Sequence, residues 1–220
     1  MTAYFITSTG TGLGKTYLTC GLIEALRRRD ITVDAVKPLI SGFEIESAED
    51  SDTGLILSAL GLPIDEPRIR EISPWRFRAA LSPDMAAQRE GLSVDRHALV
   101  EFCRSAMEMD DGLCLIEGAG GVMAPIGANY TNLDLIGALD VRIVLVAGTY
   151  LGTISHTLTA CEALAARGRE PWAIVLSESD DSPVAPSETA QSIGRFVDAP
   201  IYLLPRGAAV PDDLVETMLG

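Results

Sequence analysis

Lysine is the scarcest charged residue in this chain of 220 residues. The 17 basic residues comprise 15 arginines and only two lysines, Lys15 and Lys37. Arginine carries a wide planar fork, whereas lysine carries a compact, titratable ammonium, so an arginine-rich chain is expected to keep lysine where space is tight. Both lysines are therefore candidate functional residues, with chance retention as the alternative.

Long apolar runs and basic surface charge are also lacking. No run approaches the ~20 residues needed to span a bilayer. The chain enters an apolar stretch at Tyr4–Ile6 without a basic leader, which argues against a signal peptide. With 31 acidic residues the net charge is −14, and such a surface repels phosphate backbones. We therefore expect no nucleic-acid or membrane partner.

Cysteine is sparse, and its spacing excludes a C-x-x-C pair. The four residues are Cys20, Cys103, Cys114 and Cys161, and three of them fall in apolar segments. This pattern predicts buried free thiols, which suit a reducing, cytoplasmic location.

The composition that remains predicts one well-packed α/β domain over residues 1–220. Hydrophobic residues make up 47% of the chain, and there is no repeat or clear linker. Predicted strands are Ala3–Thr7, Thr32–Lys37, Leu113–Glu117, Arg142–Ala147, Trp172–Ser177 and Pro200–Leu204. Predicted helices are Lys15–Arg29, Thr53–Leu60, Asp95–Met109, Thr153–Ala166, Pro186–Val197 and Asp212–Leu219. This alternation predicts a mainly parallel sheet with helices on both faces, and ligands beyond the carboxyl ends of its strands. Asp65–Pro83, rich in Pro and Arg, is interpreted as a long excursion.

The first strand leads into Ser8–Thr16, which ends in Gly-Lys-Thr before a helix. This is typical of a P-loop: glycines turn backbone N–H groups toward a phosphate, Lys15 neutralises it, and the Thr16 hydroxyl ligates Mg²⁺. Thr9 occupies the place of the first glycine in the strict pattern. The alternative is a Gly-rich turn with an accidental lysine.

Three other strand ends or helix starts carry candidate residues. Lys37 ends a strand expected to lie beside the first, and Ser41-Gly42 follows it. Glu117 ends an apolar strand before a Gly-rich turn, an arrangement like Walker B, with a surface Glu as the alternative. Asp52 opens a helix, where an N-cap explains it as well as a metal role does.

The start of a later helix offers a second anion site. Leu151-Gly152-Thr153 precedes Ser155 and His156, and a helix N-terminus can hold a substrate carboxylate. His156 by itself indicates little, since a packed or surface histidine is the more ordinary case.

Together these segments resemble the dethiobiotin synthase family, over Tyr4 to about Pro205. The matching segments are Thr11–Thr16, Lys37-Pro38, Ser41-Gly42, Ser51-Asp52, Ser82-Pro83, Ala86-Ala87, Glu90-Gly91, Glu117–Gly121, and Leu151-Gly152 with His156. The resemblance implies a P-loop NTPase fold. It also implies ATP-dependent closure of the ureido ring of dethiobiotin from 7,8-diaminononanoate and CO₂, through a carbamate and a carbamic–phosphoric anhydride.

The resemblance also assigns roles to residues. Lys37, Lys15 and Thr11 would be catalytic, and Thr16, Asp52 and Glu117 would surround Mg²⁺. Substrate contacts would come from Thr11, Ser41, Gly120, Leu151, Gly152 and Ser155, in this family across a homodimer interface. ATP contacts would come from Gly12, Leu13, Gly14, Lys15, Thr16, Tyr17, Asp52, Glu117, Gly118, Ala119, Gly120, Ser177, Leu204, Pro205 and Arg206.

The chain departs from the family pattern at several positions. Ser177-Glu178 replaces an Asn-Asp pair that often meets the adenine, which allows a looser choice of nucleotide. Ser155 replaces a common Asn, which bears on carboxylate recognition. Ser8, Gly12 and Asp84 replace residues that are often Gly, Glu and His.

Three rival functions compete with this prediction. A regulatory ATPase of the partition or septum-site class would carry an extra lysine where Gly10 stands, and would need a basic face or a membrane-binding tail. A cobyrinate-type amidoligase usually carries an added glutaminase domain, for which no room remains. A pure binding module would have little use for Lys37 beside a P-loop.

Overall fold

The fold is built on one parallel sheet, as expected from the strand–helix alternation. In the computed structural model, which describes residues 2–108 and 111–220, six parallel strands form it in the order β10-β9-β8-β1-β5-β2. Their bounds are β1 (Thr2–Ser8), β2 (Val33–Val36), β5 (Leu113–Glu117), β8 (Arg142–Ala147), β9 (Ala173–Ser177) and β10 (Ile201–Leu204). The six predicted strands are thus confirmed, with ends that differ by one residue at most.

One predicted neighbour relationship is wrong. The strand that precedes Lys37 does not lie beside the first strand, because β5 is inserted between β2 and β1. In the register Val36 pairs with Ile116, and Ile6 pairs with Glu117. After β2 the chain leaves the sheet, and β5 later enters it between β1 and β2. The order of the elements along the sequence does not reveal this insertion. Glu117 is therefore placed between the P-loop strand and the Lys37 strand.

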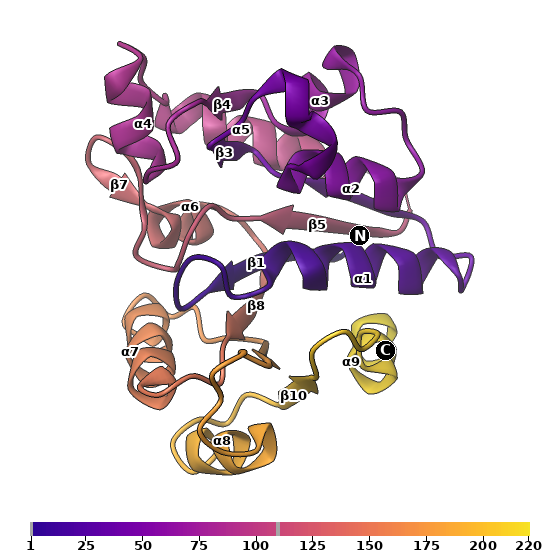
Figure 1. Ribbon diagram of the computed structural model, residues 1–220, viewed down its shortest axis with the longest axis vertical. Coiled ribbons are helices and arrows are strands. Elements are labelled where there is room, and N and C mark those ends of the chain that lie inside the picture. The colour runs from indigo at the N-terminus through magenta and orange to yellow at the C-terminus, as the bar shows by residue number, and fades with distance from the viewer. Residues whose placement is uncertain (1, 109–110) are drawn as a thin grey trace.

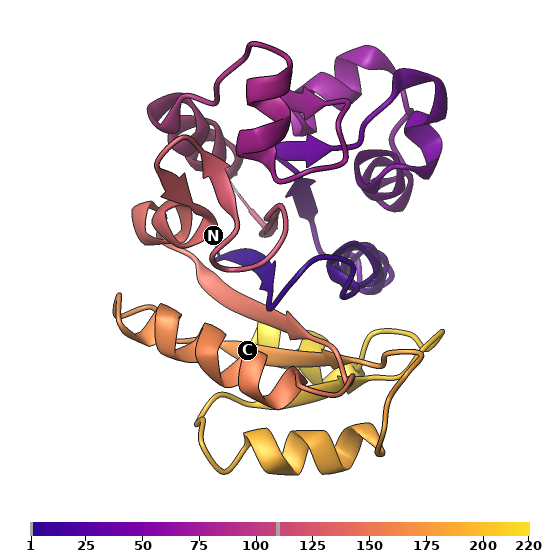
Figure 2. The ribbon, with the colours of Figure 1, turned by 60° about the vertical axis from the view of Figure 1, so that its left-hand side comes forward.

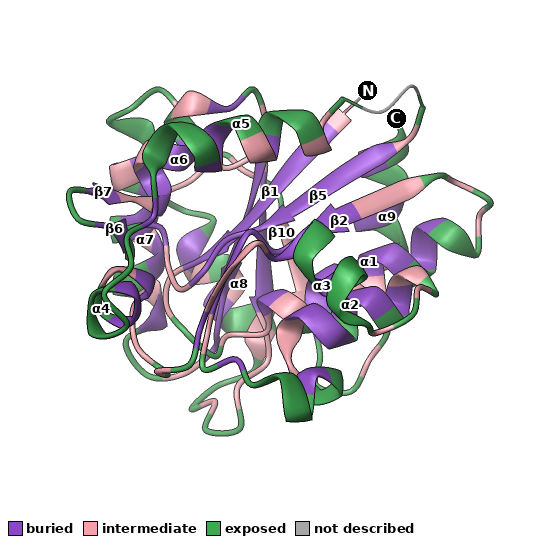
Figure 3. Cartoon of the chain, turned by 90° about the horizontal axis from the view of Figure 1, so that it is seen from above, coloured by how far each residue is buried: buried purple, intermediate pink, exposed green. Residues whose placement is uncertain are grey.

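Helices cover both faces of the sheet. Figure 3 shows α5 and α6 on one side of β1 and β5, with α1 and α2 on the other. The helices are α1 (Lys15–Arg27), η1 (Ile45–Asp50), α2 (Asp52–Leu60), α3 (Glu66–Ile72), α4 (Pro83–Arg89), α5 (Arg96–Ala106), α6 (Asn132–Ala138), α7 (Thr153–Ala165), α8 (Pro186–Ile193) and α9 (Asp212–Leu219). The predicted end of α5, Met109, lies outside the described residues, and several other helices end a few residues earlier than predicted.

The segment interpreted as an excursion does lie outside the main sheet, and it contains secondary structure that was not predicted. Asp65–Pro83 contains α3 and β4 (Trp75–Phe77), and β4 pairs with β3 (Leu39–Ser41) in a separate two-stranded sheet. The Asp65 side chain caps α3 by accepting from the Arg68 N–H at 3.0 Å. Figures 1 and 2 show β3, β4, α3 and α4 grouped at one end of the molecule. Helix α6 and the hairpin formed by β6 (Pro125–Gly127) and β7 (Tyr130–Thr131) were also not predicted from the sequence.

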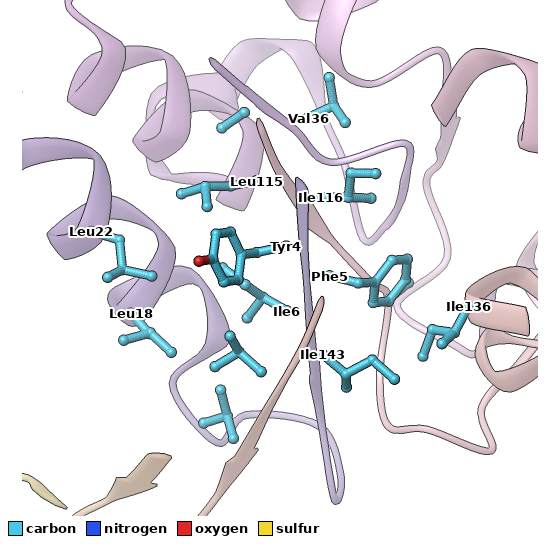
Figure 4. Packing of buried hydrophobic residues seen from close by; sticks show 14 of the residues in the cluster. Tyr4, Phe5, Ile6, Leu18, Leu22, Val36, Leu115, Ile116, Ile136 and Ile143 are labelled. Carbon is cyan, nitrogen blue, oxygen red and sulfur yellow. The ribbon is translucent and has the colours of Figure 1, made fainter. Parts of the chain in front are cut away.

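The core forms where β1 runs through the middle of the sheet. Tyr4, Phe5 and Ile6 are all fully buried. Figure 4 shows Tyr4 facing the α1 side, toward Leu22, and Phe5 pointing to the other face. A strand covered on both faces reads as a continuous apolar run, which is why β1 was predictable.

The four cysteines are free thiols, and all but the half-buried Cys20 are buried. No helix within residues 2–108 and 111–220 is long and apolar enough to cross a membrane.

Candidate active site

The turn between β1 and α1 has the geometry of a phosphate-binding loop. Gly12 and Gly14 take left-handed backbone conformations, with φ of 73° and 87°. The positive φ favours glycine at position 14, and a Cβ there would also lie 2.7 Å from Ser177 Oγ and displace that hydroxyl. Lys15 and Thr16 begin α1 directly after Gly14. The helix N-terminus and the glycine backbone therefore face a common point where an anion can bind.

Lys15 is buried at this turn and is poised to receive a negative charge. Its Nζ donates to Ser8 Oγ at 3.2 Å. Burial and, next, the nearby Lys37 ammonium lower the pKa of Lys15 to about 8, with the Glu117 carboxylate partly opposing them. A phosphate would supply the counter-charge that this ammonium lacks.

Lys37 lies between two carboxylates at the same edge of the sheet. Its Nζ is 2.9 Å from Asp52 Oδ2 and 2.5 Å from Glu117 Oε1. Burial pushes the pKa of Lys37 down, but the two carboxylates more than offset this and raise it above its usual range. Burial likewise opposes ionisation of Asp52, yet Lys37 holds its pKa below the usual value. The three groups form one cluster of charges, in which Lys37 and Glu117 are buried and Asp52 is partly exposed toward the pocket.

Glu117 is the fully buried member of this cluster, and two α1 hydroxyls hold it. Thr16 donates to Oε1 at 2.8 Å, and Thr19 donates to Oε2 at 2.6 Å. Sequence reasoning missed Thr19. Its position four residues after Lys15 places both side chains on one face of the helix, and that spacing was the available signal.

The N-cap explanation of Asp52 is wrong. The cap of α2 is Ser51, whose hydroxyl accepts from the Gly54 N–H at 3.1 Å. Asp52 is the first helical residue, and its carboxylate is free to pair with Lys37. The capping requirement therefore does not account for this acid.

One pocket lies on the outer side of the loop and has a volume of about 650 Å³; we call it the Ser177 pocket. It gathers eight of the residues expected to contact ATP, namely Gly12, Leu13, Gly14, Tyr17, Ser177, Leu204, Pro205 and Arg206. Six of its lining residues were not among the predicted ATP contacts: Tyr150, Glu178, Ser179, Asp180, Asp181 and Gly207. These come from loops beyond β8, β9 and β10, where no motif marked them.

A second pocket of about 670 Å³ lies on the other side of the loop, and we call it the Lys37 pocket. It brings together predicted residues from four segments: Thr11, Lys15, Thr16, Lys37, Ser41, Asp52, Ala119 and Gly120. The buried Ser41 hydroxyl has no hydrogen-bond partner among the described residues, so it is available to a ligand. Leu39 and Ala80–Pro83 also line this pocket and were not predicted to.

Three predicted substrate contacts lie elsewhere. Gly152 and Ser155 line a shallow groove with Phe196, and the Leu151 side chain is 86% exposed. Their segment follows β8, away from β2 and β5. His156 accepts from or donates to the Tyr150 hydroxyl at 2.8 Å, which gives it a local structural contact. Within one chain these residues do not join the Lys37 pocket.

The cluster around Glu117 fits a magnesium ion in its donor chemistry. Mg²⁺ is commonly held by one or two carboxylates together with phosphate oxygens and water. Asp52, Glu117 and the Thr16 hydroxyl supply such a set, and the Lys37 ammonium shows that their arrangement already accommodates a cation. Within residues 2–108 and 111–220, no group of three or more His, Cys, Asp or Glu side chains gathers where it could hold a metal ion, so phosphate oxygens and water would complete the coordination.

Comparison with known proteins agrees with this architecture. Residues 2–212 match the family model described as an AAA domain. The chain is also similar to MinD in the MinC:MinD cell division complex of Aquifex aeolicus, with a TM-score of 0.59 at 13% identity, covering 99% of this chain and 86% of that one. At that identity the likeness shows the fold alone, so the class is a P-loop nucleotide-binding fold.

Sequence relatives narrow the class to one family. The chain is 49% identical to the ATP-dependent dethiobiotin synthetase BioD of Caulobacter sp. (strain K31), over 94% of this chain and 89% of the relative. It is 43% identical to the protein of the same name from Phenylobacterium zucineum (strain HLK1), over 99% and 95%. The chain belongs to the ATP-dependent dethiobiotin synthetase family. It is an ATP-dependent ligase of biotin biosynthesis, as the motifs predicted.

Proposed function

We propose that the two pockets divide the dethiobiotin synthetase reaction between them, with ATP entering through the Ser177 pocket and 7,8-diaminononanoate through the Lys37 pocket. The observation that carries this proposal is that Lys15 and Lys37 stand at one edge of the sheet, on either side of Glu117, where the two pockets share the Gly12–Gly14 loop. The terminal phosphate of ATP would then lie between two ammonium groups.

The P-loop would hold the phosphates before any bond changes. Backbone N–H groups of Gly12–Gly14 and the Lys15 ammonium would bind the β- and γ-phosphates. Thr16, Asp52 and Glu117 would hold Mg²⁺, which when bound neutralises phosphate charge and orients the transferred group.

Lys37 would act on the charges that develop between substrate and nucleotide. One amine of the diamine adds to CO₂ and loses a proton, giving a carbamate. A carbamate oxygen then attacks the γ-phosphorus, ADP leaves, and the second amine attacks the carbamoyl carbon as phosphate departs. Each early step places negative charge on oxygen, and a buried, protonated Lys37 lowers the energy of that charge. The Thr11 and Ser41 hydroxyls would orient the diamine.

We further propose that the chain acts as a homodimer. Leu151 and Phe196 are apolar side chains that are 86% and 67% exposed, and both lie beside the start of α7. A second copy that covered them would bring the α7 start, with Gly152 and Ser155, toward its partner's Lys37 pocket. Replacing Leu151 with Glu would then yield a monomer in sedimentation, with a raised KM for the diamine.

Residues 1–220 are proposed to form one catalytic domain, which works in the cytoplasm. Support comes from the single main sheet and from four cysteines that remain free thiols, as suits a reducing compartment.

Phosphate release from ATP tests the assigned reaction. With bicarbonate and Mg²⁺ present, release should rise at least tenfold when diaminononanoate is added, and dethiobiotin should form in equal amount. Release that ignores the diamine would instead favour a regulatory ATPase on the same fold.

A further inference from the structure

The loop after Glu117 cannot hold itself in place with its own side chains. A Cβ at Gly118 would lie 2.9 Å from the Phe5 ring, and one at Gly121 would lie 3.0 Å from the Ser8 carbonyl oxygen. Gly120 has a φ of 71°, which favours glycine. A loop of this kind must take its orientation from neighbouring groups.

Asn132, the first residue of α6, supplies that anchor. Its Nδ2 donates to the carbonyl oxygens of Ala119 at 2.6 Å and Gly121 at 2.8 Å. Ser8 Oγ lies 3.1 Å from the carbonyl oxygen between them, that of Gly120, but its single proton has a shorter contact with the Gly10 carbonyl. One side-chain amide therefore fixes two of the loop's carbonyls.

The helix that contains Asn132 does not need this side chain. Thr131 and Asp134 already form a capping box at the start of α6. Asn132 is fully buried, and its Oδ1 has no partner among the described residues. The cavity beside it is too narrow for a water molecule to supply one. Rotating the amide would turn its oxygen toward two carbonyl oxygens, so the observed orientation is the only favourable one. Burying the unpaired Oδ1 of Asn132 costs stability, and the two bonds that its Nδ2 donates to the loop are what the side chain supplies in return.

The anchored loop forms part of the wall of the Lys37 pocket. Ala119 and Gly120 line that pocket, and neither lines the Ser177 pocket. Their backbone N–H groups have no acceptor within residues 2–108 and 111–220. Of these two donors, the Gly120 N–H belongs to the same peptide unit as the Ala119 carbonyl, so Asn132 orients it directly. That N–H points away from its own carbonyl, and Gly120 lines the pocket where the carbamate and the transferred phosphoryl group would form.

We propose that Asn132 is a positioning residue for the chemical step, which it serves by fixing the Ala119–Gly120 backbone against the reacting oxygens. The inference rests on the proposed function of the Lys37 pocket. It goes beyond that proposal because Asn132 lines neither the Lys37 pocket nor the Ser177 pocket.

The test compares Asn132→Leu, which keeps the approximate volume but removes the donor, with Asn129→Leu, which changes an exposed asparagine in the same segment. We expect Asn132→Leu to lower kcat/KM for the diamine by about 30-fold, since sub-ångström misplacement of positioned groups has effects of this order. ADP affinity, measured calorimetrically, should stay within about twofold of wild type, because Ala119 and Gly120 do not line the Ser177 pocket that is proposed to bind the nucleotide. Asn129→Leu should match wild type in both.

Two results would overturn the inference: a kcat/KM within threefold of wild type, or an ADP affinity that falls in parallel with it, which would indicate general loosening. If Asn132→Leu does not fold, Asn132→Ser decides, because its hydroxyl can donate to only one carbonyl. A loss of about fivefold with unchanged ADP affinity supports the inference, and wild-type values reject it. If wild-type protein itself shows no diamine-dependent phosphate release, the proposed function fails instead.

Discussion

The ammonium of Lys37 lies 2.9 Å from the carboxylate of Asp52, although the two residues come from different elements of the fold. Oε1 of Glu117 also lies 2.5 Å from the Lys37 ammonium. These carboxylates are also the proposed ligands of Mg²⁺. Lys37 and the metal therefore compete for one position, and metal binding would release Lys37 toward the pocket where the carbamate forms.

Removing the Lys37 ammonium should strengthen metal binding in the absence of nucleotide. In Lys37→Met the two carboxylates lose their cation and repel each other, so Mg²⁺ gains a site that it no longer has to contest. At 10 mM MgCl₂ without nucleotide, the Tm of this variant should rise by about 3 °C more than that of wild type. Equal shifts in calorimetric scans of the two proteins would show that Lys37 and the metal do not share this position.

Replacing Lys37 by the other basic residue should abolish most turnover. The wider planar fork of a guanidinium would pair with the carboxylates but crowd a site that must also hold the carbamate, the γ-phosphate and the metal. Lys37→Arg should keep its fold and bind ADP normally, yet lose about 100-fold in kcat. The reverse exchange at the exposed Arg28, whose nearest ion-pair contact is 3.7 Å long, should stay within twofold. Near-normal turnover in Lys37→Arg would remove the role assigned to the ammonium.

Thr19 should stabilise the protein through Glu117. Thr19→Val replaces the hydroxyl with a methyl group and leaves Oε2 of a fully buried carboxylate without its 2.6 Å donor. The expected cost in unfolding free energy is about 1–3 kcal/mol, measured by urea denaturation. Thr217→Val, which removes a similar hydroxyl bond to the helix backbone at an exposed site, should cost less than about 0.5 kcal/mol. Similar costs at the two sites would mean that Glu117 does not depend on Thr19.

Nucleotide affinity should fall as the pH rises through the pKa of Lys15, about 8. Bound phosphate raises that pKa, so binding above pH 8 must take up a proton, and ADP affinity should drop about tenfold from pH 7 to pH 9. Titration calorimetry in buffers of different ionisation enthalpy should record almost one proton taken up at pH 9. An affinity that is level over this range would contradict the assignment.

Whereas nucleotide affinity falls as the pH rises, the contribution of Lys15 to the stability of the free protein should increase. Burial lowers the pKa of Lys15 from 10.5 in the unfolded chain to about 8 in the folded one. The unfolded state therefore holds this proton more tightly between those values, and the contribution of Lys15 to stability increases as the pH rises from about 8 to 10.5.

Local sequence patterns predicted the parts of the fold that depend on local chemistry. The strand that contains Tyr4–Ile6 is apolar on both faces, and Gly14 followed by Lys15 marks a P-loop, so both elements were predicted from the sequence. The insertion of β5 between β2 and β1 was not predicted, because the order of strands in a sheet depends on how the connecting segments pack, which local sequence does not show. Nor was the structure within Asp65–Pro83, where prolines and arginines obscure short elements.

The same division holds for the site. Lys37 stood out because lysine is rare in this chain, and Glu117 because it ends an apolar strand. Asn132 carried no signal, since an asparagine at the start of a helix is ordinary and its contacts lie 11 and 13 residues back along the chain. The α7 start around Gly152 lies apart from the Lys37 pocket in one chain, so its predicted role stays a prediction tied to the homodimer.

A crystal structure with Mg²⁺, a non-hydrolysable ATP analogue and diaminononanoate tests the central claim most directly. The account predicts γ-phosphate density between Lys15 Nζ and Lys37 Nζ, the metal against Asp52 and Glu117, and Lys37 withdrawn from both carboxylates. A γ-phosphate bound away from either ammonium, with Lys37 still paired to Glu117, would contradict it.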